Sequence, residues 1–211
     1  RLRLVRVVAA EELVAAVAAE GDRALPADET GDQVGRDHRR VDHRLVELPG
    51  KGSHSGALEP TVAELKDGRL WMLIRHGGFF HESFSQNGGM TWSAPAATGI
   101  TNPKPAAGAP ASLIRLRDGR LVMAWNPEVA LPANATPWQK LGRVELAVAV
   151  SSDDGKTWSP PVPIARTTFI CYPHLVEHAP GQLLLSTGLL KAEGFKTDVV
   201  VFRFSADAVL K

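Results

Sequence analysis

Hydrophobic and polar residues alternate along much of the chain, and apolar stretches recur in pairs around short turns. Three segments have this form: ELKDGRLWML at 64–73, RLRDGRLVMA at 115–124 and EHAPGQLLLS at 177–186. Two apolar stretches joined by a two-residue turn that contains Gly are typical of a β-hairpin. The pattern therefore predicts three hairpins.

An alternating strand follows each predicted hairpin, and a short proline-containing strand follows the first two of these. The unit is strand, turn, strand, loop, strand, turn, strand, at about 59–99 and 109–165, and a third unit begins at Tyr172. Four antiparallel strands in a repeated unit predict the blades of a β-propeller. The third strands are FFHESFS at 79–85, RVELAVAVS at 143–151 and TDVVVFRFS at 197–205, and the fourth are SAPAATG at 93–99 and SPPVPIA at 159–165.

One eight-residue phrase occurs twice between a third and a fourth strand, as SQNGGMTW at 85–92 and SSDDGKTW at 151–158. Asp or Asn at its third position can accept backbone hydrogen bonds and fix a turn. Gly89 and Gly155 can adopt the positive φ that other residues resist. The closing Trp is expected to pack back against the sheet and to bury a large apolar area. We interpret the phrase as structural rather than catalytic.

The first 42 residues do not repeat this pattern. RLRLVRVV alternates like a strand, AAEELVAAVAAEG is typical of a short helix ending at Gly21, and the charged residues that follow are typical of a linker. HRLVELP at 43–49 has the pattern of the last strand of a preceding blade. We therefore predict an N-terminal extension outside the propeller at 1–42 and a propeller segment at 43–211.

Composition excludes several classes of protein. The formal net charge of +1 over 211 residues does not indicate a nucleic-acid or anionic-membrane partner. Cys171 is the only cysteine, so neither an intrachain disulfide nor a thiolate metal cluster is expected. No apolar run reaches the roughly 18 residues of a transmembrane helix. No pair of histidines has a familiar ligand spacing with a third partner, so we expect neither a metal nor a cofactor.

Four segments resemble the bacterial exo-α-sialidase (neuraminidase) family. The repeated phrase resembles the Asp-box of its BNR repeat. EPTVAELKDGRLWMLIR at 59–75 resembles the family segment that opens with Glu-Pro and ends in an arginine. The strand opened by Arg143 resembles the one that leads into a late Asp-box, and CYPHLVEH at 171–178 resembles the segment in which Tyr opens a blade. The resemblance covers about residues 43–211 and implies an all-β, partial propeller: about three four-stranded blades, the C-terminal half of a six-bladed ring.

The resemblance also implies roles for four residues. Tyr172 would be the nucleophile and Glu59 its base, while Arg75 and Arg143 would hold the substrate carboxylate. The carboxylate on the anomeric carbon of sialic acid repels a carboxylate nucleophile, and a neutral Tyr hydroxyl avoids that repulsion. Arginine supplies planar, permanently charged, bidentate donors for a carboxylate. The implied function is hydrolysis of terminal sialic acid, and the implied partner is a sialoside or a related acidic glycan.

Two family features have no counterpart in this sequence: the first triad arginine in its Phe/Tyr-Arg-Ile-Pro motif, and the acid/base Asp. The aspartates available before the propeller segment stand in no matching context; they are Asp22, Asp28, Asp32, Asp37 and Asp42. General acid catalysis typically contributes roughly 10²–10⁴-fold, so the isolated chain is expected to be incomplete as an enzyme. Three blades cannot close a ring of roughly 4–8, and we expect either a fragment or self-association through open propeller edges.

Two other functions are compatible with the same residues. A non-catalytic glycan-binding propeller would keep the arginines and lack the acid. A protein-interaction propeller would use the Asp-boxes only as scaffold. Trp138, in the polar loop PANATPWQK, is a candidate for contact with a ligand, whereas Trp71 and Trp125 are expected in the core.

Overall fold

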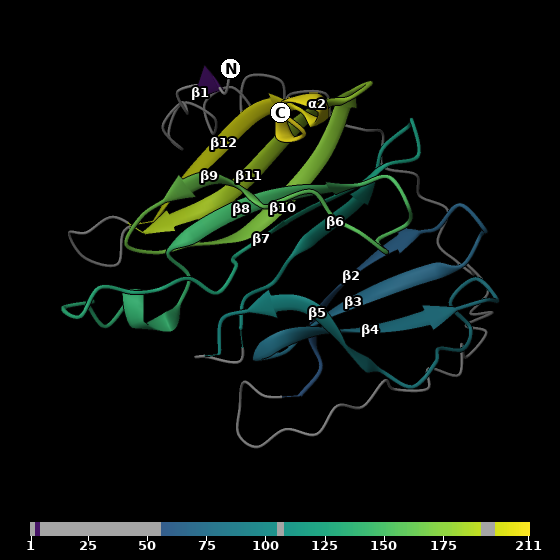
Figure 1. The fold of residues 1–211 in the computed structure, drawn as a ribbon, viewed down its shortest axis with the longest axis horizontal. Coiled ribbons are helices and arrows are strands. Elements are labelled where there is room, and N and C mark those ends of the chain that lie inside the picture. The colour runs from purple at the N-terminus through teal and green to yellow at the C-terminus, as the bar shows by residue number, and fades with distance from the viewer. Residues whose placement is uncertain (1–2, 5–55, 105–107, 191–196) are drawn as a thin grey trace, which may run out of the picture.

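Three four-stranded antiparallel sheets follow one another along the chain in the computed structural model (Figure 1). The structure describes residues 3–4, 56–104, 108–190 and 197–211. The described part of the chain is therefore nearly all β, and the predicted partial propeller is confirmed. The helix, linker and strand predicted between residues 9 and 49 lie outside the described residues.

The first two sheets each hold four strands that pair in chain order, as the repeated unit predicts. The fourth strands, β5 and β9, begin three residues after the predicted starts, beyond Pro95 and Pro161. Proline has no N–H to donate to a strand ladder, which explains the later start. The first blade consists of β2 (Leu58–Glu64), β3 (Leu70–Arg75), β4 (Gly78–Ser85) and β5 (Ala96–Asn102). The second consists of β6 (Ser112–Arg115), β7 (Leu121–Trp125), β8 (Glu145–Ser151) and β9 (Val162–Arg166).

The third blade takes its fourth strand from the opposite end of the chain. β10 (Ile170–Ala179), β11 (Gln182–Leu190) and β12 (Thr197–Ser205) pair in order, and β1 (Arg3–Leu4) pairs with the outer side of β12. The register joins Arg3 to Arg203 and Leu4 to Phe202. A short helix, α2 (Ala206–Val209), follows β12, and the Ser205 hydroxyl accepts a hydrogen bond from its Ala208 N–H at 3.2 Å.

The core consists of two apolar layers, one on each side of the second blade. Alternate residues of β7 point to opposite layers: Met123 and Trp125 pack against the first blade, while Val122 and Ala124 pack against the third. All five residues of β7 are buried, so the strand is continuously apolar rather than alternating. Trp71, on the first blade, is 3% exposed, which confirms its predicted place in the core.

The two copies of the repeated phrase fold into the same self-contained turn. In the second copy, Asp153 accepts from the Ser151 hydroxyl at 2.8 Å and from the Thr157 N–H at 2.9 Å. In the first, Asn87 accepts from the Ser85 hydroxyl at 3.0 Å and from the Thr91 N–H at 2.9 Å. The third-position side chains are therefore used inside the turn, in agreement with the structural interpretation.

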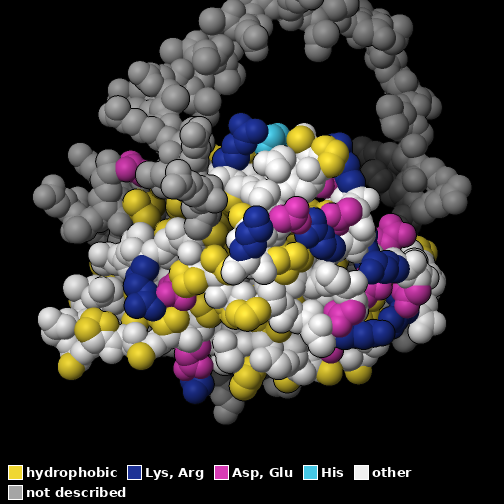
Figure 2. Space-filling view, turned by 45° about the horizontal axis from the view of Figure 1, so that its top comes forward, with side chains coloured by type: hydrophobic (Ala, Val, Ile, Leu, Met, Phe, Trp, Pro, Cys, Tyr) yellow, Lys and Arg dark blue, Asp and Glu magenta, His cyan; other side chains and the backbone are white. Residues whose placement is uncertain are grey.

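Basic and acidic side chains are interspersed on the face shown in Figure 2, with hydrophobic side chains between them. This mixture matches the formal net charge of +1. No helix among the described residues has both the length and the apolar character needed to span a membrane.

Candidate functional site

The predicted site residues lie where strands begin or end on one side of the three blades. Glu59 is the second residue of β2, and Arg75 ends the neighbouring strand β3. Arg143 lies two residues before β8, and Tyr172 is the third residue of β10. Because β2, β8 and β10 run from this side and β3 runs toward it, the antiparallel topology gathers all four positions there.

Arg75 and Glu59 form an ion pair. Nη1 of Arg75 donates to Oε2 of Glu59 at 2.6 Å, and the Arg75 side chain is 3% exposed. A buried guanidinium needs such a partner because an unpaired buried charge is strongly destabilising. The Glu59 side chain, 40% exposed, connects this buried pair to the surface.

Arg143 is also buried, and it lies between two aromatic rings. Its Nη2 donates to the Gly108 carbonyl oxygen at 2.9 Å. Its Cζ lies 5.7 Å from the centroid of the Phe169 ring and 5.7 Å from that of Tyr172, which is the geometry of a cation–π contact on each. Its Nε is buried and has no acceptor within the described part of the chain. A buried donor without an acceptor is unusual and marks a place where a water or ligand is expected.

Tyr172 has an exposed side chain on a strained backbone. Its side chain is 56% exposed and its φ is +59°, while Glu59 has a φ of +40°. In both strands the register shifts at this place, between Cys171 and His174 and between Leu58 and Thr61. Such bulges change the direction of a side chain, and a positive φ outside glycine costs roughly 1–3 kcal/mol. Strain of this kind concentrates at functional sites.

The buried thiol of Cys171 shows how close the charged groups are. Burial raises the pKa of this thiol, and the nearby Arg143 guanidinium lowers it through its charge and a hydrogen bond. The charges of Glu59 and Arg75 act on the same thiol, Glu59 raising its pKa and Arg75 lowering it. Arg143, Glu59 and Arg75 therefore all lie close enough to Cys171, the residue before Tyr172, to act on its thiol electrostatically.

The role of Glu59 as the base for Tyr172 remains a prediction. The described residues contain no hydrogen bond between the Tyr172 hydroxyl and Glu59, whose carboxylate accepts from Arg75 instead. The reason is electrostatic, because a charged, buried guanidinium is a stronger partner for a carboxylate than a neutral hydroxyl. The sequence does not reveal this choice of partner.

Asn126 was not identified from the sequence, although it occupies the position in the second hairpin that Arg75 occupies in the first. It is fully buried, and its Nδ2 donates to the carbonyl oxygens of Glu145 at 2.6 Å and Ile170 at 2.9 Å. It therefore joins the start of β8, near Arg143, to the start of β10. Alignment of the three hairpins would have indicated it.

Trp138 lies beside this site, in the loop between β7 and β8. Its ring makes an edge-to-face contact with Phe169, with the centroids 5.6 Å apart and the planes at 72°. Phe169 in turn contacts Arg143. Trp138 is 37% exposed, so its sequence-based assignment to ligand contact remains a prediction that its position permits.

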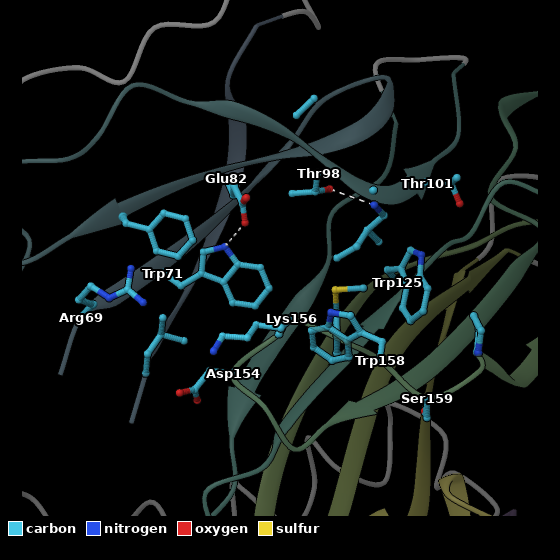
Figure 3. A pocket seen from close by; sticks show the side chains of 18 of the residues that line it. Arg69, Trp71, Glu82, Thr98, Thr101, Trp125, Asp154, Lys156, Trp158 and Ser159 are labelled. Carbon is cyan, nitrogen blue, oxygen red and sulfur yellow. Dashed lines mark hydrogen bonds between the residues drawn. The ribbon is translucent and has the colours of Figure 1, made fainter. Parts of the chain in front are cut away.

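A separate groove of about 900 Å³ lies between the first and second blades (Figure 3). Its lining includes Trp71, Glu82, Trp158 and Lys156, and none of the four predicted site residues. Trp71 Nε1 donates to Oε2 of Glu82 at 2.9 Å; burial raises the pKa of Glu82, and this hydrogen bond lowers it. The groove also has buried donors without an acceptor among the described residues, Nε1 of Trp125 and of Trp158, and a positive φ of +61° at Asp154. We place the candidate site at the arginines because the Arg75–Glu59 ion pair and the contact of Arg143 with Tyr172 join the residues that the family resemblance implies.

Among the described residues, no group of three His, Cys, Asp or Glu side chains could hold a metal ion.

Comparison with known proteins shows a repeat family and a fold. The family model described as "BNR repeat-like domain" matches residues 9–185. No curated protein sequence matches the chain. At 16–19% identity, the similarity to the solved structures below shows the fold alone.

Three solved structures illustrate the similarity. The intramolecular trans-sialidase of Ruminococcus gnavus matches with a TM-score of 0.55 and 19% identity, over 74% of this chain and 34% of that one. The NanB sialidase of Streptococcus pneumoniae matches with a TM-score of 0.54 and 18% identity, over 76% of this chain and 25% of that one. The α-L-arabinofuranosidase Arb93A of Fusarium graminearum matches with a TM-score of 0.54 and 16% identity, over 76% of this chain and 49% of that one. The chain thus spans between a quarter and a half of the length of these proteins.

Proposed function

The chain belongs to the BNR repeat-like domain family, and on this premise we propose that it is part of a sialidase-like glycoside hydrolase that acts on terminal sialic acid. The observation that carries the proposal is that Arg143 contacts the Tyr172 ring, with Cζ 5.7 Å from its centroid, while Arg75, which is also buried, is paired with Glu59 at 2.6 Å. Similar folds in two sialidases support the proposal, and one of them was solved with oseltamivir carboxylate.

In the proposed reaction the two arginines hold the substrate carboxylate. Tyr172 attacks the anomeric carbon as the glycosidic C–O bond breaks, and Glu59 receives the proton from its hydroxyl. Water then hydrolyses the glycosyl–Tyr bond with overall retention, and Tyr172 regains its proton. Oε2 of Glu59 accepts from Arg75, so we assign the proton transfer to the other oxygen. The proposal assigns no proton donor for the leaving oxygen, because the acid/base Asp of the family has no counterpart in this sequence.

The experiment is hydrolysis of 4-methylumbelliferyl α-N-acetylneuraminide by the full chain and by three variants. Tyr172→Phe removes the nucleophile and Arg143→Ala removes one carboxylate contact. Arg117→Ala is the matched control, because Arg117 is an exposed arginine beside the second hairpin turn. Turnover that is abolished by the first change, reduced by the second and kept in the control supports the proposal. Turnover that survives Tyr172→Phe contradicts it.

One observation favours a second candidate, a non-catalytic module that binds acidic glycans. Glu59 accepts from Arg75 rather than from Tyr172, which suits recognition of a carboxylate without activation of a nucleophile. This candidate predicts no turnover, with binding of N-acetylneuraminic acid that survives Tyr172→Phe and is lost in Arg143→Ala. A chain that neither binds the acid nor hydrolyses the sialoside would contradict both candidates.

A further inference from the structure

Asn102, the last residue of β5, connects the surroundings of the two arginines. It is fully buried, and both ends of its amide are used. Nδ2 donates to the backbone oxygen of His76 at 3.0 Å, and Oδ1 accepts from the Ala109 N–H at 2.9 Å. His76 directly follows Arg75, and Ala109 directly follows Gly108, whose carbonyl oxygen accepts from Arg143. The Asn102 amide therefore connects the backbone next to Arg75 with the backbone next to Gly108, the residue that accepts from Arg143.

Two close backbone approaches hold this connection in place. Gly108 has a φ of +81°, and a Cβ added there would lie 2.8 Å from the His76 oxygen and against the Asn102 amide. Gly142, which precedes Arg143, has a φ of +78°, and a Cβ there would lie 2.7 Å from Cβ of Pro103. Asn102 and Pro103, at the end of β5, therefore pack directly against Gly108 and Gly142. Neither glycine has room for a side chain.

We propose that Asn102 is a positioning residue that sets the separation of Arg75 and Arg143, so that both guanidinium groups can hold one carboxylate. The proposal rests on the proposed recognition of an acidic sugar. It adds that Asn102 holds the two arginines at the spacing that one carboxylate requires. Two arginines bind one carboxylate well only if their spacing is held within about 0.5 Å, which requires support from residues behind them. An Asn side chain suits this place because it donates and accepts at once.

Asn102→Asp is the sharpest variant. It keeps an oxygen for the Ala109 N–H and places a second oxygen where the donor to His76 was, so that two acceptors face each other. Gly108→Ala disturbs the same connection by its added methyl group and a strained φ. Ser83→Ala is the matched control: Ser83 is buried in the same blade and donates to the Ser93 oxygen at 2.7 Å, and the bond that it loses belongs to neither arginine.

The first readout is calorimetric titration with N-acetylneuraminic acid and with its methyl ester, which lacks the charged carboxylate. We expect Asn102→Asp and Gly108→Ala to weaken binding of the acid by about ten- to a hundredfold, the loss of roughly one charge-assisted hydrogen bond. Ser83→Ala should leave the affinity unchanged, and the ester should bind weakly to all four proteins. Because Asn102→Asp and Gly108→Ala affect one connection, their effects should be less than additive in the double variant.

The second readout needs no ligand and separates this proposal from the proposed function. NMR signals of the Arg75 and Arg143 Nε–H groups report how firmly each guanidinium is held. We expect faster hydrogen exchange at Arg143 in Asn102→Asp and in Gly108→Ala, with unchanged exchange in Ser83→Ala. If the unmodified chain binds no acid but the exchange changes as expected, the proposed function fails and the positioning role stands. Unchanged arginine signals in folded Asn102→Asp and Gly108→Ala proteins would overturn the positioning role.

Discussion

Glu59 and Tyr172 occupy equivalent positions in two different blades, and both have a left-handed backbone. Each lies five residues before the glutamate that precedes a hairpin turn, Glu64 or Glu177, and each is followed by proline. Their φ values are +40° and +59°. The repeat therefore supplies the same strained position twice, and the two copies carry the residues to which we assign base and nucleophile.

The strain at Tyr172 predicts an unusual order of stability. With φ at +59°, Tyr172→Gly should be more stable than Tyr172→Ala by about 1 kcal/mol, because glycine adopts this conformation without strain. Urea unfolding followed by tryptophan fluorescence measures the difference. The control is the same pair of changes at His174, an exposed residue of the same strand, where the Ala variant should be the more stable. If the Ala variant were the more stable one at position 172 as well, Tyr172 would not be strained.

Removal of the charge on Glu59 should destabilise the fold. Glu59→Gln leaves the buried Arg75 without its carboxylate, and we expect the free energy of unfolding to fall by about 1–2 kcal/mol, a modest figure because Glu59 is half-exposed. Glu64→Gln, an exposed change in the same strand, should alter stability by less than about 0.5 kcal/mol. Equal unfolding midpoints for both variants would mean that the ion pair contributes nothing measurable.

The two Asp-box glycines should differ in their tolerance of a methyl group. Gly155 and Gly89 occupy the same place in the phrase, with φ of +81° and +91°. A Cβ at Gly155 would lie 2.6 Å from the Trp71 ring, whereas a Cβ at Gly89 would make an ordinary contact of 3.6 Å with Leu70. We expect Gly155→Ala to cost about 1–3 kcal/mol more than Gly89→Ala, because backbone strain is common to both and overpacking is not. Thermal unfolding of the pair tests this, and equal costs would contradict it.

The second Asp-box should make part of the stability dependent on pH. The pKa of Asp153 is lowered from 3.8 to about 2, chiefly by the hydrogen bond from the Thr157 hydroxyl. A carboxyl group with a lowered folded-state pKa stabilises the fold above its unfolded-state pKa, and this contribution disappears as the pH falls through the folded-state value. We therefore expect the native chain to exceed Asp153→Asn in stability at pH 5, and the difference to shrink between about pH 4 and pH 2. The first box, which has Asn87 at this place, supplies the control: Asn87→Asp should introduce a similar dependence. A gap between the native chain and Asp153→Asn that stays constant from pH 5 to pH 2 would count against this assignment.

Local repetition made the blades predictable, since hairpins and boxed turns are encoded in short segments. The site was predictable only as a set of positions. That Glu59 pairs with Arg75 depends on which partner lies nearest after folding, and no spacing in the sequence encodes it. Asn102 could not be distinguished from an ordinary loop asparagine, because its role arises from the backbone groups of His76 and Ala109, which only folding brings together. The alternation in RLRLVRVV indicated a strand, but not that Arg3–Leu4 would pair with β12.

The pairing of β1 with β12 also affects how the chain can be assembled. Arg3 and its partner Arg203 lie about 200 positions apart in the sequence, so the third blade gains its outer strand only through a contact between distant segments. Contacts between such distant residues are slow to form because a long loop must close first. Until this contact forms, the edge of β12 is open to other strands, and a change beside Arg3 would affect the blade that carries Tyr172.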